Sequence, residues 1–176
     1  MPLNEVEAMA LIAESIRRTT GVTVGDEHLG VAFAMLDQIY GQRKRQAATS
    51  IRELLPYLPT RQDRVLAAAF PAIFFQGFRR KPVTVVVSST ALAQEDARLY
   101  SALLQELQLP KKVVAPTDQR QVPPAMARER PRFMVAALDV VAAVTRHEPV
   151  MIARLSPDAT SRLAAVVPNT ATLPDP

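Results

Sequence analysis

Hydrophobic residues recur at helical spacing in the first part of the chain. Over residues 5–20, apolar side chains stand three or four positions apart, basic residues gather near the end, and Gly21 follows. This pattern predicts an amphipathic helix that stops at a glycine. Apolar residues between Gly25 and Gly41 predict a second helix. Both helices precede any strand pattern, so we expect a helical N-terminal lead-in.

The middle of the chain alternates between helix and strand patterns. A solvated basic run over 42–46 leads to a short helix or strand over 50–55. Residues 65–75 are apolar almost all round, which predicts a buried helix. Residues 83–87, VTVVV, are continuous and β-branched, as is typical of a parallel strand covered on both faces. Leucines at helical spacing predict a helix over 91–107.

The alternation continues toward the end of the chain. Three further strands and one helical segment are predicted, over 111–115, 133–137, 150–155 and 138–144. Strands that alternate with helices indicate an α/β domain with a parallel sheet of about four or five strands. We expect a single domain over residues 1–168, which suits a length of 176 residues. Residues 169–176 lack a pattern and are expected to form a flexible tail.

Composition narrows the kinds of protein that the chain can be. The hydrophobic content of 48% supports a globular domain, and the absence of cysteine leaves no disulfide or thiolate metal site. The two histidines cannot form a zinc site alone. Acids stand early in the chain where a secretion signal carries basic residues, and no apolar run approaches the roughly 20 residues of a membrane span. We therefore expect a cytoplasmic protein without a transmembrane segment.

The net charge of +4 raises the question of an acidic partner such as nucleic acid. Seventeen acidic residues are interspersed among twenty-one basic ones, which is ordinary for a solvated surface. Two basic clusters precede predicted strands, and they comprise Arg79, Arg80, Lys81 and Arg128, Arg130, Arg132. Such clusters fit phosphate contacts, but no aromatic platform accompanies them, so solvated loops are the favoured interpretation.

Two segments carry motifs of one known family. Residues 14–29, ESIRRTTGVTVGDEHL, are similar to a run of a helix, a turn and DVQL. Residues 83–109, VTVVVSSTALAQEDARLYSALLQELQL, are similar to VHVVTVNDYLAQRDAEW and the helix that follows it. With these motifs the chain resembles the N-terminal nucleotide-binding motor domain of SecA, the preprotein translocase. LAQED is the specific motif within a resemblance that spans about residues 5–170. The resemblance implies a P-loop, helicase-like (RecA-like) α/β fold, and Glu95 and Asp96 of LAQED are expected to serve the helix start and solvation.

The segment Thr60–Ile73, TRQDRVLAAAFPAI, lies over TGEGKTLVATLPAY, the phosphate loop and helix of the family. A phosphate loop needs glycines that let backbone N–H groups approach the anion, a lysine for the phosphates and a hydroxyl for Mg²⁺. Arg64 is the candidate phosphate contact, whereas Val65 offers Mg²⁺ no oxygen. The resemblance thus implies a degenerate nucleotide site at Thr60, Arg61, Gln62, Asp63, Arg64 and Val65.

A second nucleotide motif of the family, DEVDS, falls on residues 150–156, VMIARLS. Its acidic positions map to Ala153 and Arg154, and the glutamine that reads adenine maps to His28, which also fits a capped or half-buried surface position. Phosphoryl transfer is mostly positioning and charge neutralisation, so these losses remove its main contributions. A rival register that places residues 45–50 at the loop lacks the glycines and the lysine too. We expect neither enzymatic activity nor a cofactor.

The expected function is that of a non-catalytic SecA-like remnant that binds a protein as an accessory, adaptor or regulator, with a link to protein export. Its partner is of unknown identity, and the secretion machinery or a second motor-like lobe would fit. The candidate partner surface comprises Phe74, Phe75, Phe78, Arg79, Arg80 and Lys81. Core positions are the favoured interpretation of the phenylalanines, and an exposed patch that docks a partner is the alternative. A basic, helicase-like nucleic-acid binder and a nucleotide sensor without hydrolysis are the alternatives.

Overall fold

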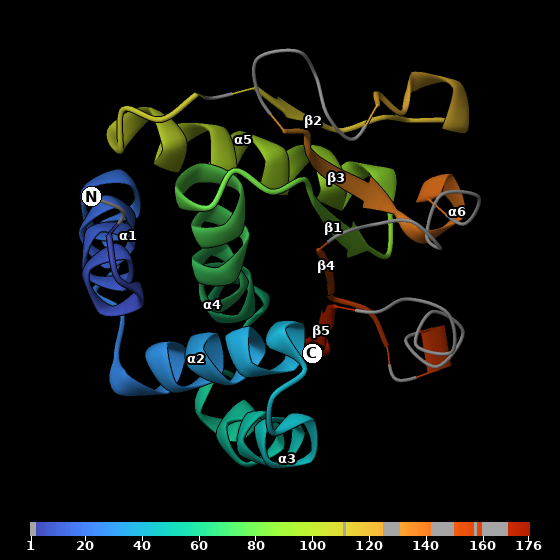
Figure 1. Ribbon diagram of the computed structural model, residues 1–176. Helices are drawn as coiled ribbons and strands as arrows, with labels where there is room; N and C mark the ends of the chain where they lie inside the picture. Colours follow the sequence, from blue (N-terminus) through green and yellow to red (C-terminus); the bar gives the residue numbers. More distant parts are fainter. Residues whose placement is uncertain (1–2, 111, 125–130, 142–149, 157, 160–168) are drawn as a thin grey trace.

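The computed structural model has an α/β fold built on one five-stranded sheet (Figure 1). It describes residues 3–110, 112–124, 131–141, 150–156, 158–159 and 169–176. All paired strands are parallel, and their order is β2-β3-β1-β4-β5. They span Val83–Val87 (β1), Val113–Val114 (β2), Phe133–Ala137 (β3), Met151–Ala153 (β4) and Thr170–Thr172 (β5). The expected α/β class with a parallel sheet is confirmed.

Four helices come before the first strand, which confirms the helical lead-in. Asn4 caps α1 (Glu5–Thr20) through a capping box with Glu7, and Gly21 ends this helix in the left-handed region with a φ of 76°. Helix α2 spans Asp26–Tyr40 and also ends at a glycine with positive φ. The other helical segments are α3 (Lys44–Leu54), η1 (Leu55–Tyr57), α4 (Arg61–Ile73), η2 (Phe74–Phe78), α5 (Thr90–Glu106), η3 (Gln119–Gln121) and α6 (Leu138–Val141).

Helix α3 differs from the expected basic run and separate short element. It runs without a break from Lys44, inside the basic run, to Leu54. Ala47 and Ile51 are its buried residues, and α3 packs against α2. The two apolar residues stand four positions apart, so one narrow apolar stripe suffices to hold a helix that is polar elsewhere.

Strand β1 lies at the centre of the sheet. It pairs with β3 on one side and with β4 on the other, so that Val85 stands opposite both Val135 and Ile152. All five of its residues are buried, as the β-branched run VTVVV predicts. Helices α1, α2 and α4 lie on one side of the sheet and α6 on the other (Figure 1).

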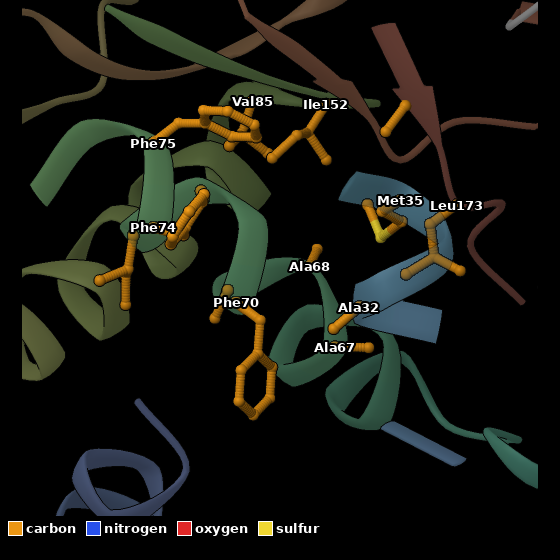
Figure 2. Packing of buried hydrophobic residues seen from close by; sticks show 14 of the residues in the cluster. Ala32, Met35, Ala67, Ala68, Phe70, Phe74, Phe75, Val85, Ile152 and Leu173 are labelled. Atoms are coloured by element: carbon orange, nitrogen blue, oxygen red, sulfur yellow. The ribbon is translucent and has the colours of Figure 1, made fainter. Parts of the chain in front are cut away.

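The larger core lies between the sheet and the N-terminal helices. Figure 2 shows Phe75 reaching from η2 toward Val85 and Ile152, and Met35 of α2 beside Leu173. Phe74 and Phe75 meet edge to face, with ring centroids 5.2 Å apart. The sheet is therefore anchored to the helical lead-in through aromatic contacts.

The prediction of a flexible tail over residues 169–176 is wrong. Residues Thr170–Thr172 form strand β5, which pairs with β4 along its whole length. Ala171 and Leu173 are completely buried, and the backbone N–H of Leu173 donates to the carbonyl of Ala153. The apolar positions are too few to produce a readable strand pattern, but the neighbouring strand supplies their hydrogen bonds.

Two further expectations fall on parts of the chain that the structure does not describe. The helical segment expected over 138–144 is present as α6 up to Val141, and its remainder lies outside the described residues. Arg128 and Arg130 of the second basic cluster lie outside them as well. Among the described residues, no helix has the length and apolar character needed to cross a membrane.

Candidate functional site at the carboxyl edge of the sheet

The ends of the parallel strands meet around one cavity. Ser88 follows β1, Leu138 follows β3, Arg154 follows β4 and Asp175 lies beyond β5. The cavity has a volume of about 270 Å³ and is lined by Ser88, Leu138, Arg154, Leu155, Ser156, Ala159, Asp175 and Pro176. Its position is set by the parallel topology, because the carboxyl ends of all five strands lie at this edge.

The cavity lies where the connections of the sheet diverge. Helix α5 follows β1 and packs on the face with the larger core, whereas α6 follows the adjacent β3 and packs on the opposite face. In open α/β sheets, ligands bind outside the carboxyl ends of the strands at such a topological switch point. This edge is therefore the first place to look for a functional site.

Arg154 is the central side chain of this edge and is completely buried. Its Nη1 donates to the carboxylate of Asp96, and its Nη2 lies 3.0 and 3.2 Å from the two carboxylate oxygens of Asp175. Burial opposes the charged guanidinium, but nearby Tyr100, Asp96 and Asp175 together raise the pKa of Arg154 above its ordinary value. Arg154 is thus a buried cation held by two carboxylates.

Arg61 completes a four-residue ion cluster with Arg154, Asp96 and Asp175. Its Nη2 donates to Asp96 Oδ1 at 2.7 Å, and its Nε lies 3.9 Å from Asp175 Oδ2. Two guanidinium cations thus face two carboxylates, so the cluster is balanced in charge. Leaving a buried charge without its partner is costly, whereas this cluster pairs each of its charges.

The expectation that Asp96 serves only helix start and solvation is wrong. Its side chain is 1% exposed and joins α4, α5 and the end of β4 through Arg61 and Arg154. The neighbouring Glu95 does face solvent and lies 3.6 Å from Arg61. Burial separates the roles of these adjacent acids.

The positions mapped to the phosphate loop form the start of a helix. Thr60 is the N-cap of α4, its side chain accepts from the N–H of Asp63, and the Asp63 carboxylate accepts from the Thr60 N–H. Residues 61–65 belong to the first turns of α4, where Gln62 is exposed and Val65 buried. A P-loop joins a strand to a helix, but α4 follows η1 and a short loop, all within the described residues.

His28 and Asp63 tie α2 to α4. The His28 Nδ1 accepts from the N–H of Gly25, so the Nε2 carries the proton and donates to Asp63 Oδ1 at 3.2 Å. Burial raises the pKa of Asp63, but hydrogen bonds from Thr60 and His28 outweigh it, and the net pKa is lowered. Both ring nitrogens of His28 are used within the fold.

Arg64, the candidate phosphate contact, also has partners within the fold. Its Nε donates to the carbonyl of Leu58 at 2.9 Å and its Nη1 to that of Pro174 at 2.6 Å. Burial lowers the pKa of Arg64, although Asp175 and Asp63 oppose the change. A phosphate at Arg64 would have to displace the Pro174 carbonyl.

Comparisons with protein-family models, curated proteins and solved structures found no match. The resemblance to SecA therefore stays a prediction drawn from motifs. The positions mapped to the second nucleotide motif, Ala153 and Arg154, are both buried at the end of β4. Among the described residues, no three histidine, cysteine or acidic side chains are grouped closely enough to hold a metal ion.

The structure brings together some of the mapped residues and separates others. Arg61 and Arg154 share one ion cluster, whereas His28, Thr60 and Asp63 form a neighbouring cap. Asp175 and the buried role of Asp96 were not predicted from the sequence. Neither carries a local signal, because their partners lie 21 and 58 positions away from them in the chain.

The prediction that Phe74, Phe75 and Phe78 form part of a partner surface needs a correction. Phe74 and Phe75 are buried, so they do not line a surface, and Phe78 is partly buried. Their rings instead lie beneath the basic residues, with Arg79 4.8 Å above Phe74 and Lys81 6.0 Å above Phe75. These cation–π contacts hold part of the basic cluster at the surface.

The second basic cluster contributes a structural side chain. Arg132 is buried, and it donates to the carbonyl of Pro123 at 2.9 Å and to Thr84 Oγ1 at 3.4 Å. It ties the loop before β3 to β1. Its guanidinium therefore serves the fold at the opposite, amino edge of the sheet.

Proposed function

We propose that this chain is a non-catalytic SecA-like domain that binds a protein partner through the basic surface at Arg79, Arg80 and Lys81. The observation that carries the proposal is the neighbourhood of this cluster. Tyr40 is 45% exposed, and its ring centroid lies 5.5 Å from that of Phe75. Partial burial and the charge of Glu5 raise the pKa of the Tyr40 hydroxyl, whereas Arg79 opposes this change. Cations and an exposed aromatic ring thus share one surface.

Helix α1 extends this surface with apolar area. It packs against η2, and Val6, which follows Glu5, is 68% exposed. Interfaces combine apolar and aromatic anchors with a polar rim, and opposite charge guides encounter. The partner that fits is a protein segment with acidic side chains around an apolar residue.

The carboxyl edge supports the non-catalytic part of the proposal. In the resemblance to SecA, the acidic positions that hold Mg²⁺ and orient water map to Ala153 and Arg154. The guanidinium of Arg154 would repel a metal cation. Arg154 is moreover engaged by Asp96 and Asp175. Phosphoryl transfer depends on neutralising phosphate charge with Mg²⁺ at this edge. The link to protein export rests on the motif resemblance alone and is part of the proposal.

Capture with paired charge variants tests the partner surface. Three proteins are immobilised. They are the wild-type chain, a variant with Arg79, Arg80 and Lys81 changed to Glu, and a control variant with Arg43, Lys44 and Arg45 changed to Glu. The control changes net charge equally on the exposed start of α3. We expect the wild type and the control variant to capture an acidic protein that the variant at Arg79, Arg80 and Lys81 does not capture. Equal loss in both variants, or loss in neither, would overturn the proposed surface.

Two further measurements separate the alternatives. Titration with DNA and RNA over a salt series tests the nucleic-acid reading, because counterion release makes such binding strongly salt-dependent. Nucleic-acid affinity that disappears with the Arg79, Arg80 and Lys81 variant would replace the protein partner with a nucleic acid. Release of phosphate from ATP and Mg²⁺ tests catalysis, and turnover above the uncatalysed rate would refute the non-catalytic proposal.

A further inference from the structure

We propose that Arg61 and Arg154 form an oxyanion-binding site that Asp175 occupies as an internal anion, and that a phosphate group can exchange with its carboxylate. The site lies beside the cavity of about 270 Å³ at the switch point of the sheet. The ligand class is inorganic phosphate or a small phosphate monoester. This inference does not depend on the proposed protein partner.

The two carboxylates of the cluster differ in accessibility. The Asp96 side chain is 1% exposed, whereas that of Asp175 is 17% exposed and lines the cavity. Asp96 lies within α5, but Asp175 lies beyond the last paired residues of β5. Asp175 is therefore the anion that can leave without opening the core.

Asp175 leaves a neighbouring donor unused, because Arg61 Nε lies 3.9 Å from Asp175 Oδ2, beyond hydrogen-bond distance. Both Asp175 oxygens take hydrogen bonds from one nitrogen, Nη2 of Arg154. Among the residues that the structure describes, the Nε atoms of Arg154 and Arg61 are buried and have no hydrogen-bond partner. In a guanidinium, Nε–H and one Nη2–H point along the same edge and bind two oxygens of a carboxylate or phosphate together. A tetrahedral phosphate brings more acceptor oxygens to these donors.

Helix α5 adds a second attraction for an anion. Ser89 caps its N-terminus, Ser88 immediately before it lines the cavity, and the first turn contains no acid. The N-terminus of a helix carries partial positive charge and free N–H groups. Exchange of Asp175 for phosphate would keep an anion beside the two arginines, and a dianionic phosphate would add about one further negative charge.

The segment that carries Asp175 is attached at two points. The Leu173 N–H donates to Ala153, and the Pro174 carbonyl accepts from Arg64. Departure of the Asp175 side chain leaves both contacts intact, because they belong to the preceding backbone. Exchange therefore needs a local movement of one carboxylate.

Phosphate titration followed by backbone amide NMR tests the exchange. Inorganic phosphate is added to the wild type, to Asp175→Ala, and to Glu53→Ala as a control that removes an exposed carboxylate from α3. We expect saturable shifts of the backbone amides of Ser88, Arg154, Leu173 and Asp175 in the wild type. Binding to Asp175→Ala should be at least about tenfold tighter, because the competing carboxylate is gone, and binding to Glu53→Ala should equal that of wild type.

Companion measurements keep the test decisive. The double variant Arg61→Gln with Asp175→Ala should not show the tighter phosphate binding of Asp175→Ala alone. A titration with phenyl phosphate, compared with that of inorganic phosphate, shows whether a monoester fits the site. If Asp175→Ala does not fold, the wild-type shifts and their loss in Arg61→Gln decide. Absence of saturable shifts in the wild type and in Asp175→Ala, or an equal gain in Glu53→Ala, would overturn the site. The Arg79, Arg80 and Lys81 variant should bind phosphate as wild type does, so that failure here is distinguishable from failure of the partner surface.

Discussion

Arg154 and Asp175 join the ends of β4 and β5, with Nη2 of Arg154 3.0 Å from Oδ1 of Asp175. Two arginines of the first turn of α4 also contact the residues after β5, where Arg61 approaches Asp175 and Arg64 binds the carbonyl of Pro174. The first turn of α4 is thus contacted by Pro174 and Asp175, which follow the last strand. Ionic contacts and strand pairing act together there.

Removal of the charge of Asp96 should destabilise the fold strongly. Asp96→Asn leaves Arg154 buried with one carboxylate fewer, and breaking such a pair costs about 3–5 kcal/mol. Urea unfolding followed by circular dichroism measures this loss. Glu95→Gln is the matched control, because the adjacent carboxylate is exposed and a surface pair contributes at most about 1 kcal/mol. Equal effects of the two substitutions would contradict the ion cluster.

Truncation of Leu173 tests the strand that replaces the expected tail. Leu173 is completely buried beside Met35 of α2, so Leu173→Ala should lower the free energy of unfolding by about 2–5 kcal/mol (Figure 2). Val6→Ala removes an exposed side chain from α1 and should change stability little. A loosely attached tail would make Leu173→Ala as mild as its control. Thermal and urea unfolding distinguish these outcomes.

The helices and the central strand were readable because their signals are local. The start and glycine stop of α1 and the run VTVVV of β1 depend on neighbours within a few positions. The same holds for the buried helix α4, whose apolar residues leave no polar stripe. Helix α1 and strand β1 have the expected bounds, whereas α4 begins at Arg61, four residues before the expected start. The parallel sheet followed from the alternation of helices and strands.

The ion cluster and β5 could not be read in this way. Asp96 looks like an ordinary acid at a helix start, and only the pairing of distant strands brings Arg154 to it. The partners of Asp175 and of β5 come from β4 and the residue after it. Strand β4 pairs with the three residues of β5, and Arg154 pairs with the carboxylate of Asp175. The phenylalanines of η2 pose the same difficulty, because helical spacing alone does not say whether a fully apolar helix faces a partner or the core of its own fold.

The N-cap of α4 should contribute measurably to the stability of the fold. Thr60→Ala removes the hydroxyl that accepts from the Asp63 N–H and donates to its carboxylate, at a cost of about 1 kcal/mol. Thr49→Ala is a suitable control, because the Thr49 hydroxyl only binds the carbonyl of Arg45 within exposed α3. Urea unfolding should show the larger loss for Thr60→Ala. A reversed order would show that the cap does not hold α4.

The Asp63 carboxylate should make stability depend on pH. Hydrogen bonds from Thr60 and His28 lower its pKa in the folded chain, whereas an aspartate in the unfolded chain titrates near 3.9. Between the two values the unfolded chain binds more protons, so stability rises with pH. The contribution is fully present above about pH 5 and is lost as the pH falls through the folded pKa.

Asp63→Asn removes that titration. Its free energy of unfolding should lie below that of wild type at neutral pH, and the gap should shrink steadily below about pH 4. Urea unfolding at a series of pH values measures the gap, with Asp158→Asn as a control at an exposed carboxylate. A gap that stays constant down to about pH 2.5 would show that the Asp63 charge does not stabilise the fold. A gap that closes on acidification would show that the hydrogen bonds from Thr60 and His28 stabilise the charged form of Asp63.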